Sequence, residues 1–196
     1  MSRPRCSRCH RPQSHCLCPL IPFLPNRTAV LILQHPSEAG HALNTARLAA
    51  LGLASAELKM GEVFEDEPLA GGAGDYLLFP GENALSLSEL AMVPRPIRLI
   101  VPDGTWRKAR KLLYLNPRLA ALPRVALPEG TGSRYRLRKA PSAGALSTIE
   151  AIVVALNALE GAGRFDALLR PFDALIDGQI EAMGTELFQR NHLSRR

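Results

Sequence analysis

The sequence predicts an α/β fold with a largely parallel sheet, and three observations lead to this class. Residues 28–34 form a nearly continuous β-branched and aliphatic run, typical of a strand buried on both faces. Shorter apolar runs at 76–79 and 98–101 end at proline and glycine, in 80–81 and 102–104, where the chain must turn. Helical patterns alternate with these strands, and such alternation indicates an α/β protein.

The predicted helices complete the order of elements. They cover residues 41–51, 106–115, 147–159 and 172–188. The last of them carries an apolar stripe at helical spacing, formed by Leu175, Ile176, Ile180, Met183 and Leu187. Open parallel sheets bind ligands beyond the carboxyl ends of their strands. We therefore expect the functional site in three loops, at 34–38, 79–83 and 102–106.

Length and composition exclude several classes of protein. The chain has 196 residues, of which 46% are hydrophobic and 21% charged, and its mean hydropathy is -0.00. One well-buried core is possible at this size, and a wholly disordered chain is excluded. The apolar runs are too short to span a bilayer, so we expect no membrane association. Arginines and cysteines, rather than an apolar leader, follow Met1, which predicts a cytoplasmic protein.

All the cysteines of the chain fall within its first eighteen residues, and this clustering indicates a metal site. They are Cys6, Cys9, Cys16 and Cys18. Two short cysteine pairs in a reducing compartment more often hold metal than form disulfides, and four thiolates suit a closed, structural zinc site. A redox pair or an unstructured tail are the alternatives, and His10 or His15 could replace one cysteine. Prolines at 19, 22 and 25 then predict a boundary between a zinc-binding knuckle, 1–25, and a main domain, 26–196.

The positive charge of the chain is local. The net charge is +6, but residues 107–139 contain ten Lys or Arg against one acid, Glu129. Two clusters in this stretch could face a polyanion, with Tyr114 and Tyr135 as candidate stacking platforms for bases. A solvated surface is the alternative. The local excess favours a nucleic-acid partner.

The loop after residues 98–101 has the composition of a reactive site. Walker, dinucleotide-binding, zincin and nucleophile-elbow motifs are absent from the sequence, which excludes the usual forms of those enzymes. Asp103, Gly104, Thr105 and Trp106 instead place a carboxylate and the single tryptophan at the end of a strand. Asp103 could serve as a base toward a nucleobase. It could equally be the N-cap of the next helix, with Trp106 in the core.

Two further stretches have more than one interpretation. Ser147 and Glu150 have the spacing of a capping box, and the free amides at that helix start would also suit a ligand carboxylate. His35 follows the first strand, within Gln34-His35-Pro36 and ahead of Glu38 and Asn44-Thr45. It is either a surface histidine or a substrate contact.

Together these motifs resemble the DTW-domain family. The cysteine pairs, the stretch around His35, residues 78–81, residues 103–106 and residues 147–151 occur in the same order in that family, over residues 6–159. The chain is similar to its bacterial tRNA-uridine aminocarboxypropyltransferases. The resemblance implies a SPOUT-like α/β fold with a knotted C-terminal half. It also implies transfer of the 3-amino-3-carboxypropyl group of S-adenosylmethionine to N3 of a tRNA uridine, in the variable loop, with release of methylthioadenosine.

The resemblance also implies roles for particular residues. Catalysis would involve Asp103, Thr105 and Trp106. The S-adenosylmethionine pocket would be formed by Phe79, Pro80, Gly81, Val101, Leu146, Ser147, Thr148 and Glu150. Contacts to tRNA would come from His35, Arg107, Lys108, Arg110, Lys111, Arg134, Arg136, Arg138 and Lys139. Zinc would be structural, and a monomer and a homodimer both remain open.

Two competing functions make different predictions. A SPOUT-type RNA methyltransferase would share the fold and the donor but release S-adenosylhomocysteine. A zinc-ribbon RNA-binding protein without catalytic activity would tolerate Asp103→Ala and lose its function on charge reversal at Arg107 or Arg136.

Overall fold

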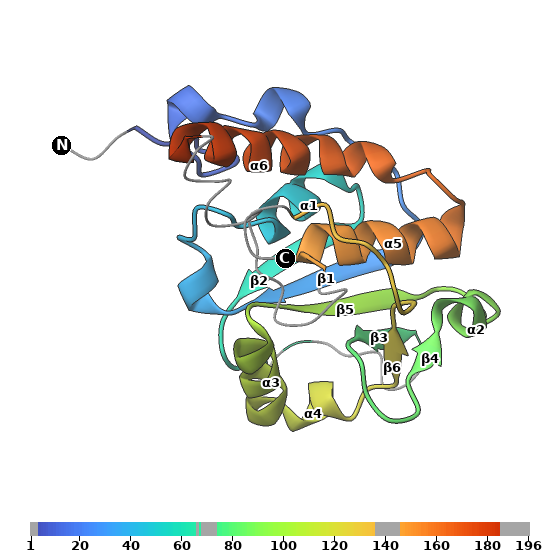
Figure 1. Ribbon diagram of the computed structural model, residues 1–196. Coiled ribbons are helices and arrows are strands. Elements are labelled where there is room, and N and C mark those ends of the chain that lie inside the picture. The colour runs from blue at the N-terminus through green and yellow to red at the C-terminus, as the bar shows by residue number, and fades with distance from the viewer. Residues whose placement is uncertain (1–3, 66, 68–73, 136–145, 185–196) are drawn as a thin grey trace.

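The computed structural model describes residues 4–65, 67, 74–135 and 146–184, which fold around one six-stranded sheet (Figure 1). The strand order is β2-β1-β5-β3-β6-β4, and each neighbouring pair is parallel. The strands are β1 (Ala29–Gln34), β2 (Ala56–Met60), β3 (Asp75–Leu78), β4 (Leu85–Ser86), β5 (Arg98–Asp103) and β6 (Arg124–Ala126). The predicted α/β class with a parallel sheet is confirmed.

Helices cover both faces of this sheet. In Figure 1, α1, α5 and α6 lie on one side of it and α3 and α4 on the other, while α2 lies at the β4 edge. The helices are α1 (Ala46–Gly52), α2 (Leu87–Ala91), α3 (Trp106–Leu115), α4 (Pro117–Ala120), α5 (Thr148–Glu160) and α6 (Arg170–Met183). Short 3-10 turns cover Gln13–His15, Cys18–Leu20, Pro36–Glu38 and Asp166–Leu169. None of the helices in the described ranges is both long and apolar enough to span a membrane.

The two faces of β1 explain why its sequence is apolar up to Gln34, its last residue. Val30 and Ile32 belong to the larger core, which includes buried residues of α1, α5 and α6. Leu31 and Leu33 point the other way, into a smaller core that α3 and α4 complete. Successive side chains of a strand face opposite sides of the sheet, so a strand covered on both sides needs apolar residues at every position.

Two predicted helices differ from the structure at their ends. The helix expected at 41–51 begins only at Ala46, because side chains of the preceding loop bond to nearby backbone: Leu43 donates its N–H to His41, and Asn44 donates to the carbonyl of Glu38. The helix expected at 172–188 ends at Met183, where Gly184 adopts a positive φ of 85°. A left-handed residue of this kind is a common helix stop.

The N-terminal segment packs against the body. Cys9, Leu17 and Ile21 are buried in the same hydrophobic cluster as β1 and α5. Leu24 forms an isolated parallel bridge with Leu53, just after α1. In Figure 1 the segment lies alongside α6. The predicted knuckle therefore shares its core with the main domain.

Candidate active site

Asp103 lies at the carboxyl end of β5, where other side chains hold both oxygens of its carboxylate. Gln34 is its register partner on β1 and donates from Nε2 to Oδ2 at 2.8 Å. Thr148 begins α5 and donates its hydroxyl to Oδ1. Asp103 is only 8% exposed. Its carboxylate is thus held in one orientation at the edge of the sheet where parallel α/β proteins bind ligands.

Thr105, and not Asp103, is the N-cap of α3. The side chain of Thr105 accepts a hydrogen bond from the N–H of Lys108 at 3.4 Å. Between the two residues, Gly104 has a φ of +155°, and a Cβ there would lie 3.0 Å from the Cβ of Lys108. A residue with a side chain would be strained at this turn. The alternative in which Asp103 caps the helix is therefore wrong, and its carboxylate faces ligand space instead.

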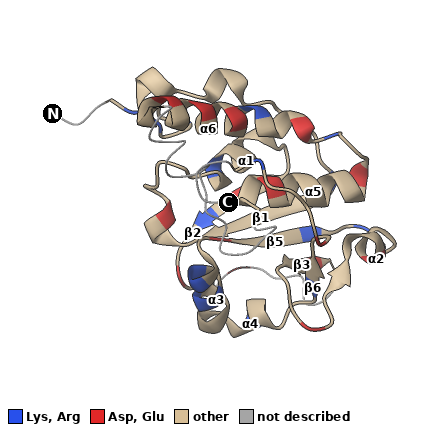
Figure 2. Cartoon of the chain, viewed as in Figure 1, with Lys and Arg blue, Asp and Glu red and all other residues tan. Residues whose placement is uncertain are grey.

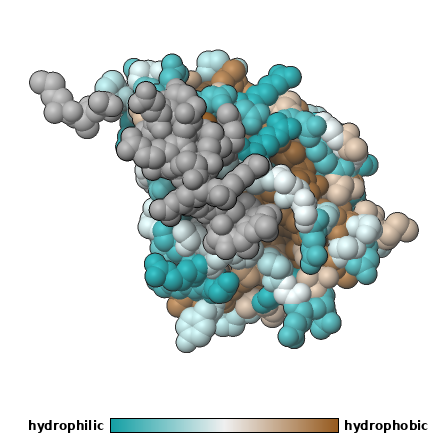
Figure 3. All heavy atoms as spheres, viewed as in Figure 1, coloured by the Kyte–Doolittle hydropathy of each residue, from teal (hydrophilic) through white to brown (hydrophobic). Residues whose placement is uncertain are grey.

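An apolar cavity of about 210 Å³ lies on one side of this turn. The loops after β3 and β5, strand β6 and the first turns of α3 and α5 enclose it. The structure brings most of the predicted donor-binding residues together here, along with Trp106. They are Phe79, Pro80, Val101, Leu146, Ser147 and Thr148. Hydrophobic surface is visible over β5 and α5 in the space-filling view (Figure 3).

A second, more polar cavity of about 360 Å³ adjoins the first. Asp103, Thr105, Lys108 and Asn44 are among its lining residues. Gly104, Ser147 and Thr148 line both cavities, so a single turn and a single helix start separate them. The arrangement can hold two ligands side by side, with the carboxylate of Asp103 at the second.

Phe79 and Trp106 form one wall of the apolar cavity. Their ring centroids are 5.4 Å apart, with 61° between the ring planes. The guanidinium of Arg124 lies 5.9 Å from the centroid of the Phe79 ring and donates to the carbonyl of Pro80 at 3.2 Å. Gly81 leaves room for this guanidinium, because a Cβ there would lie 2.5 Å from it. Gly81 therefore supports the wall from outside and does not line the cavity.

Glu150 ties the start of α5 to the loop before it. Its carboxylate accepts from the N–H of Ser147 at 2.8 Å and from the N–H of Arg134 at 2.6 Å, and the hydroxyl of Ser133 donates to it at 3.1 Å. The predicted capping box is present. Glu150 is 4% exposed and does not line the apolar cavity, so in this structure it shapes the site from behind.

Of the predicted RNA contacts on α3, two are already paired with glutamates and, in the described part of the chain, two are not. Lys108 bonds to Glu38 at 2.6 Å and Lys111 to Glu62 at 2.9 Å. Hydrogen bonding from Lys111 lowers the pKa of Glu62 below its usual 4.5. Arg107 and Arg110 are exposed and have no ion-pair partner among the described residues. Figure 2 shows basic residues gathered on α3, whereas α6 carries acidic ones.

The other predicted RNA contacts lie elsewhere. Arg134 pairs with Asp173 of α6 at 3.2 Å. The Nδ1 atom of His35 lies 3.3 Å from the backbone nitrogen of Ser37, and its Nε2 atom lies 2.7 Å from a carboxylate oxygen of Glu62. His35 is thus a support for the loop after β1. Three further predicted contacts lie outside the described residues: Arg136, Arg138 and Lys139.

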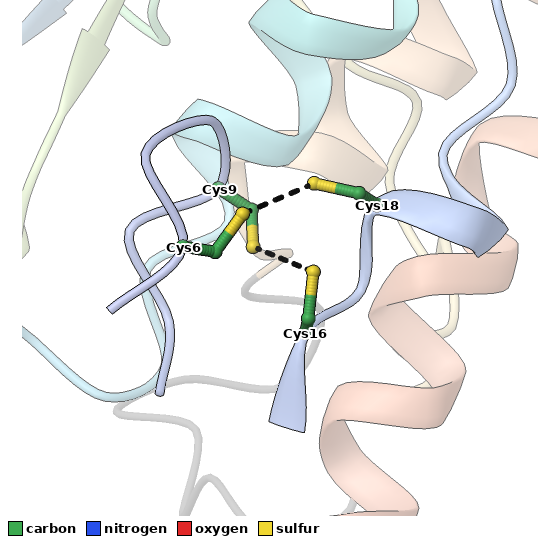
Figure 4. Close-up of side chains that lie close together, drawn as sticks. All are labelled: Cys6, Cys9, Cys16 and Cys18. Atoms are coloured by element: carbon green, nitrogen blue, oxygen red, sulfur yellow. Dashed lines mark hydrogen bonds between the residues drawn. The ribbon is translucent and has the colours of Figure 1, made fainter. Parts of the chain in front are cut away.

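The four cysteines converge on one point (Figure 4). Their sulfur atoms all lie within 4.8 Å of one another, with 3.6 Å between Cys6 and Cys18 and 3.8 Å between Cys9 and Cys16. Backbone N–H groups of Cys9 and Arg8 lower the pKa of Cys6 to about 6, which favours its thiolate. His10 and His15 are outside this group. The cluster can hold a metal ion with four sulfur ligands.

This geometry accompanies a family match over nearly the whole chain. The model of the DTW domain matches residues 3–180. The chain belongs to the DTW domain family. Residues 103–106, which carry the Asp-x-Thr-Trp motif of the predicted family, form the turn between the two cavities. The predicted membership is therefore confirmed.

Named relatives of this DTW domain come from animals and plants. The chain is 34% identical to tRNA-uridine aminocarboxypropyltransferase 2 of Macaca fascicularis, over 97% of the chain and 68% of that protein. It is 35% identical to the Mus musculus protein of the same name, over 91% of the chain and 64% of that protein. tRNA-uridine aminocarboxypropyltransferase A of Arabidopsis thaliana is 31% identical over 81% and 73%. The chain thus spans about two thirds of the mammalian relatives. No solved structure matches it significantly.

Sequence reasoning missed some residues that build this DTW site. Gln34 and Asn44 were noted only as part of a motif, yet Gln34 bonds to Asp103 and also donates to Asn44 at 3.3 Å. The signal that could have found Gln34 is a polar side chain at the end of a buried strand. Residues 125–127 complete the apolar cavity, and no sequence motif marks them.

Proposed function

We propose that this DTW domain transfers the 3-amino-3-carboxypropyl group of S-adenosylmethionine to N3 of a uridine in the variable loop of tRNA. The names of its relatives support the reaction. One structural observation supports it most directly: an apolar and a polar cavity share a wall, with the carboxylate of Asp103 beside that wall. A transferase needs such a pair of adjoining sites, because donor and acceptor must meet in line.

The donor fits the apolar cavity by its chemistry. Its adenine is a flat, mostly apolar ring, and Phe79, Trp106 and Leu146 offer an apolar lining. Its amino-acid end carries a carboxylate, and the first turn of α5, at Thr148, presents backbone N–H groups to an anion. This placement would direct the methylene next to the sulfonium toward the shared wall. S-adenosylmethionine supplies the activated carbon when it is bound there.

The acceptor uracil would occupy the polar cavity. Its N3 carries a proton, which the carboxylate of Asp103 accepts as N3 attacks the methylene carbon of the donor. The N3–carbon bond forms, the carbon–sulfur bond breaks, and the electron pair of that bond stays on sulfur, giving neutral methylthioadenosine. Gln34 and Thr148 keep the carboxylate in place during this step. Thr105 acts indirectly, by starting α3 at the turn.

We assign zinc to the four-cysteine cluster. Four sulfurs at about 2.3 Å from one zinc ion lie roughly 3.8 Å from one another in a tetrahedron. The sulfur pairs at 3.6 and 3.8 Å agree with this spacing. The residues that would hold the ion are Cys6, Cys9, Cys16 and Cys18. Four thiolates leave no open position, so the ion would stabilise the knuckle and take no part in transfer.

Three further expectations, on the knot, the division of the chain and the cellular compartment, complete the proposal. The SPOUT-like knot would involve the C-terminal half of the chain, and the parallel sheet with α5 packed over β5 is compatible with it. The division into residues 1–25 and 26–196 would be one of function, since both parts share a core. We also place the enzyme in the cytoplasm.

The proposal is tested by the small-molecule product. Purified protein is incubated with unmodified tRNA and S-adenosylmethionine, and the product is identified by mass spectrometry. We expect methylthioadenosine and a uridine heavier by one aminocarboxypropyl group. S-adenosylhomocysteine would instead support a methyltransferase. Absence of any product with all tRNA pools, from protein that binds tRNA, would support an RNA-binding protein without this activity.

A further inference from the structure

A basic groove lies next to the cysteine cluster and adjoins the polar cavity described above. This hollow of about 320 Å³ runs between the knuckle, the loop before α1 and the C-terminal half of α6. Its charged and titratable lining consists of Arg5, Arg11, Arg47, His10, His15, His41 and Cys9, the last of which belongs to the cysteine cluster. Carboxylates are absent from the described lining, and none of its three arginines forms an ion pair with a described residue.

Arg11 presents an unused hydrogen-bond donor in this groove. Its Nη1 donates to the carbonyl of Ala42 at 2.9 Å, which fixes the guanidinium against the loop. Its Nε is buried and has no hydrogen-bond partner among the described residues. Leaving a buried N–H of a charged group unpaired costs free energy, which a ligand oxygen would recover. The planar guanidinium is well suited to bind phosphate through two N–H groups.

The groove is continuous with the polar cavity beside Asp103. His41 and Asn44 line both. An extended anion that enters the polar cavity can therefore continue along the loop before α1 toward the knuckle. The other basic surface near the site offers less free charge, because Lys108 and Lys111 of α3 are already paired with Glu38 and Glu62.

We propose that the groove formed by Arg5, Arg11 and Arg47 binds the RNA phosphates that flank the target uridine. This inference rests on the proposed function, because it takes the polar cavity as the uridine site. It gives the knuckle a second role: the metal cluster holds Arg5 and Arg11 on one wall, and Arg47 of α1 forms the other. The occupant is a nucleic-acid backbone, since the groove runs into a cavity sized for a base.

The test compares tRNA binding by two variants of the full-length protein. One carries Arg5→Gln, Arg11→Gln and Arg47→Gln. The control carries Arg170→Gln, an exposed arginine at the start of α6 that does not line the groove. Affinity for an unmodified tRNA transcript is measured at several salt concentrations. We expect the triple variant to bind at least about tenfold more weakly, with a shallower salt dependence, and the control to match the wild type.

Further measurements make the outcome decisive. Zinc content and melting temperature show whether the triple variant is folded. Arg47→Gln alone leaves the knuckle sequence intact and should still weaken binding about threefold. Unchanged tRNA affinity and salt dependence in a folded triple variant would overturn the inference even if methylthioadenosine is formed. An equal loss of affinity for poly-glutamate would also overturn it. If the triple variant binds tRNA more weakly but the wild-type protein forms no methylthioadenosine, only the proposed reaction is refuted, and the inference about the groove stands.

Discussion

Gln34 and Asp103 are register partners on adjacent parallel strands, and their side chains are joined by a 2.8 Å hydrogen bond at the edge of the sheet. The backbone ladder between β1 and β5 therefore sets the distance between the two side chains. Thr148 holds the second carboxylate oxygen from α5. Three elements that are distant in sequence thus fix one carboxylate, and preorganisation of this kind is what a general base requires.

Asp103→Asn should abolish most of the transfer activity. The amide keeps the size of the side chain but cannot accept the N3 proton, so we expect kcat to fall about 10²- to 10⁴-fold. Release of methylthioadenosine measures the rate. Affinity for S-adenosylmethionine should change little, because Asp103 does not line the apolar cavity. A variant that retains full activity would show that another group takes the proton.

Gln34→Leu should reduce kcat about tenfold and leave the KM for S-adenosylmethionine unchanged. The substitution removes one of the two groups that orient the carboxylate of Asp103. Gln34→Glu would place a second carboxylate beside the first, raise the pKa of the pair and move the pH optimum upward. A pH profile of kcat for both variants tests this. If both kcat and the KM for S-adenosylmethionine worsen and the melting temperature falls, the role of Gln34 is purely structural.

Trp106→Leu should weaken donor binding. The substitution removes the edge-to-face contact with Phe79 and opens the wall of the apolar cavity. Such aromatic contacts contribute about 0.5–1.5 kcal/mol. We therefore expect the KM for S-adenosylmethionine to rise roughly two- to tenfold and the KM for tRNA to stay the same. Leu113→Ile, in the smaller core beneath α3, is a suitable packing control.

Glu160→Gln should flatten the acid side of the stability profile. Burial opposes ionisation of Glu160, but hydrogen bonds from the N–H groups of Thr28 and Arg27 outweigh it, so its pKa lies below the usual 4.5. A depressed pKa contributes stability above pH 4.5, and this is lost as the pH falls through the folded value. The wild type should therefore lose melting temperature more steeply below pH 4.5 than the variant. Exposed Glu82→Gln should leave the wild-type profile unchanged.

Cys9→Ser should remove the metal and destabilise the whole protein. Elemental analysis should find one zinc ion per wild-type chain and much less in the variant. A chelator should lower the melting temperature of the wild type, because metal binding contributes to folding free energy. Ser7→Ala, within the same turn but not a ligand, is the matched control. One zinc ion in fully folded Cys9→Ser protein would contradict the assigned ligand set.

The sequence predicted the elements that carry strong local patterns. Residues 106–115 were predicted as a helix, which is α3 as observed, and β1 was placed to within one residue. The strands β2, β4 and β6 were missed. β4 and β6 have only two and three residues, too few for a periodicity, and the edge strand β2 has no buried run. Motif order identified the family. It could not predict the pairing of Lys108 with Glu38, because these residues lie 70 positions apart in the sequence. Local patterns do not contain that information.

The same limit applies to the site. Asp103 and Trp106 were found because a carboxylate and a lone tryptophan at the end of a strand are unusual. The resemblance placed Glu150 in the donor pocket, yet its carboxylate accepts from backbone N–H groups behind the pocket. Only the fold shows that this carboxylate takes the N–H groups of Ser147 and Arg134, and not those of the first turn of α5 that our proposal gives to the donor.

If zinc fills the cluster as proposed, the burial of Cys9 and Leu17 within the main core has a physiological consequence. A chain that fails to acquire its metal would expose part of the surface on which α6 rests, and cellular proteases remove such chains. The amount of active enzyme, and with it the extent of modification on the RNA, would then follow the supply of zinc in the cell.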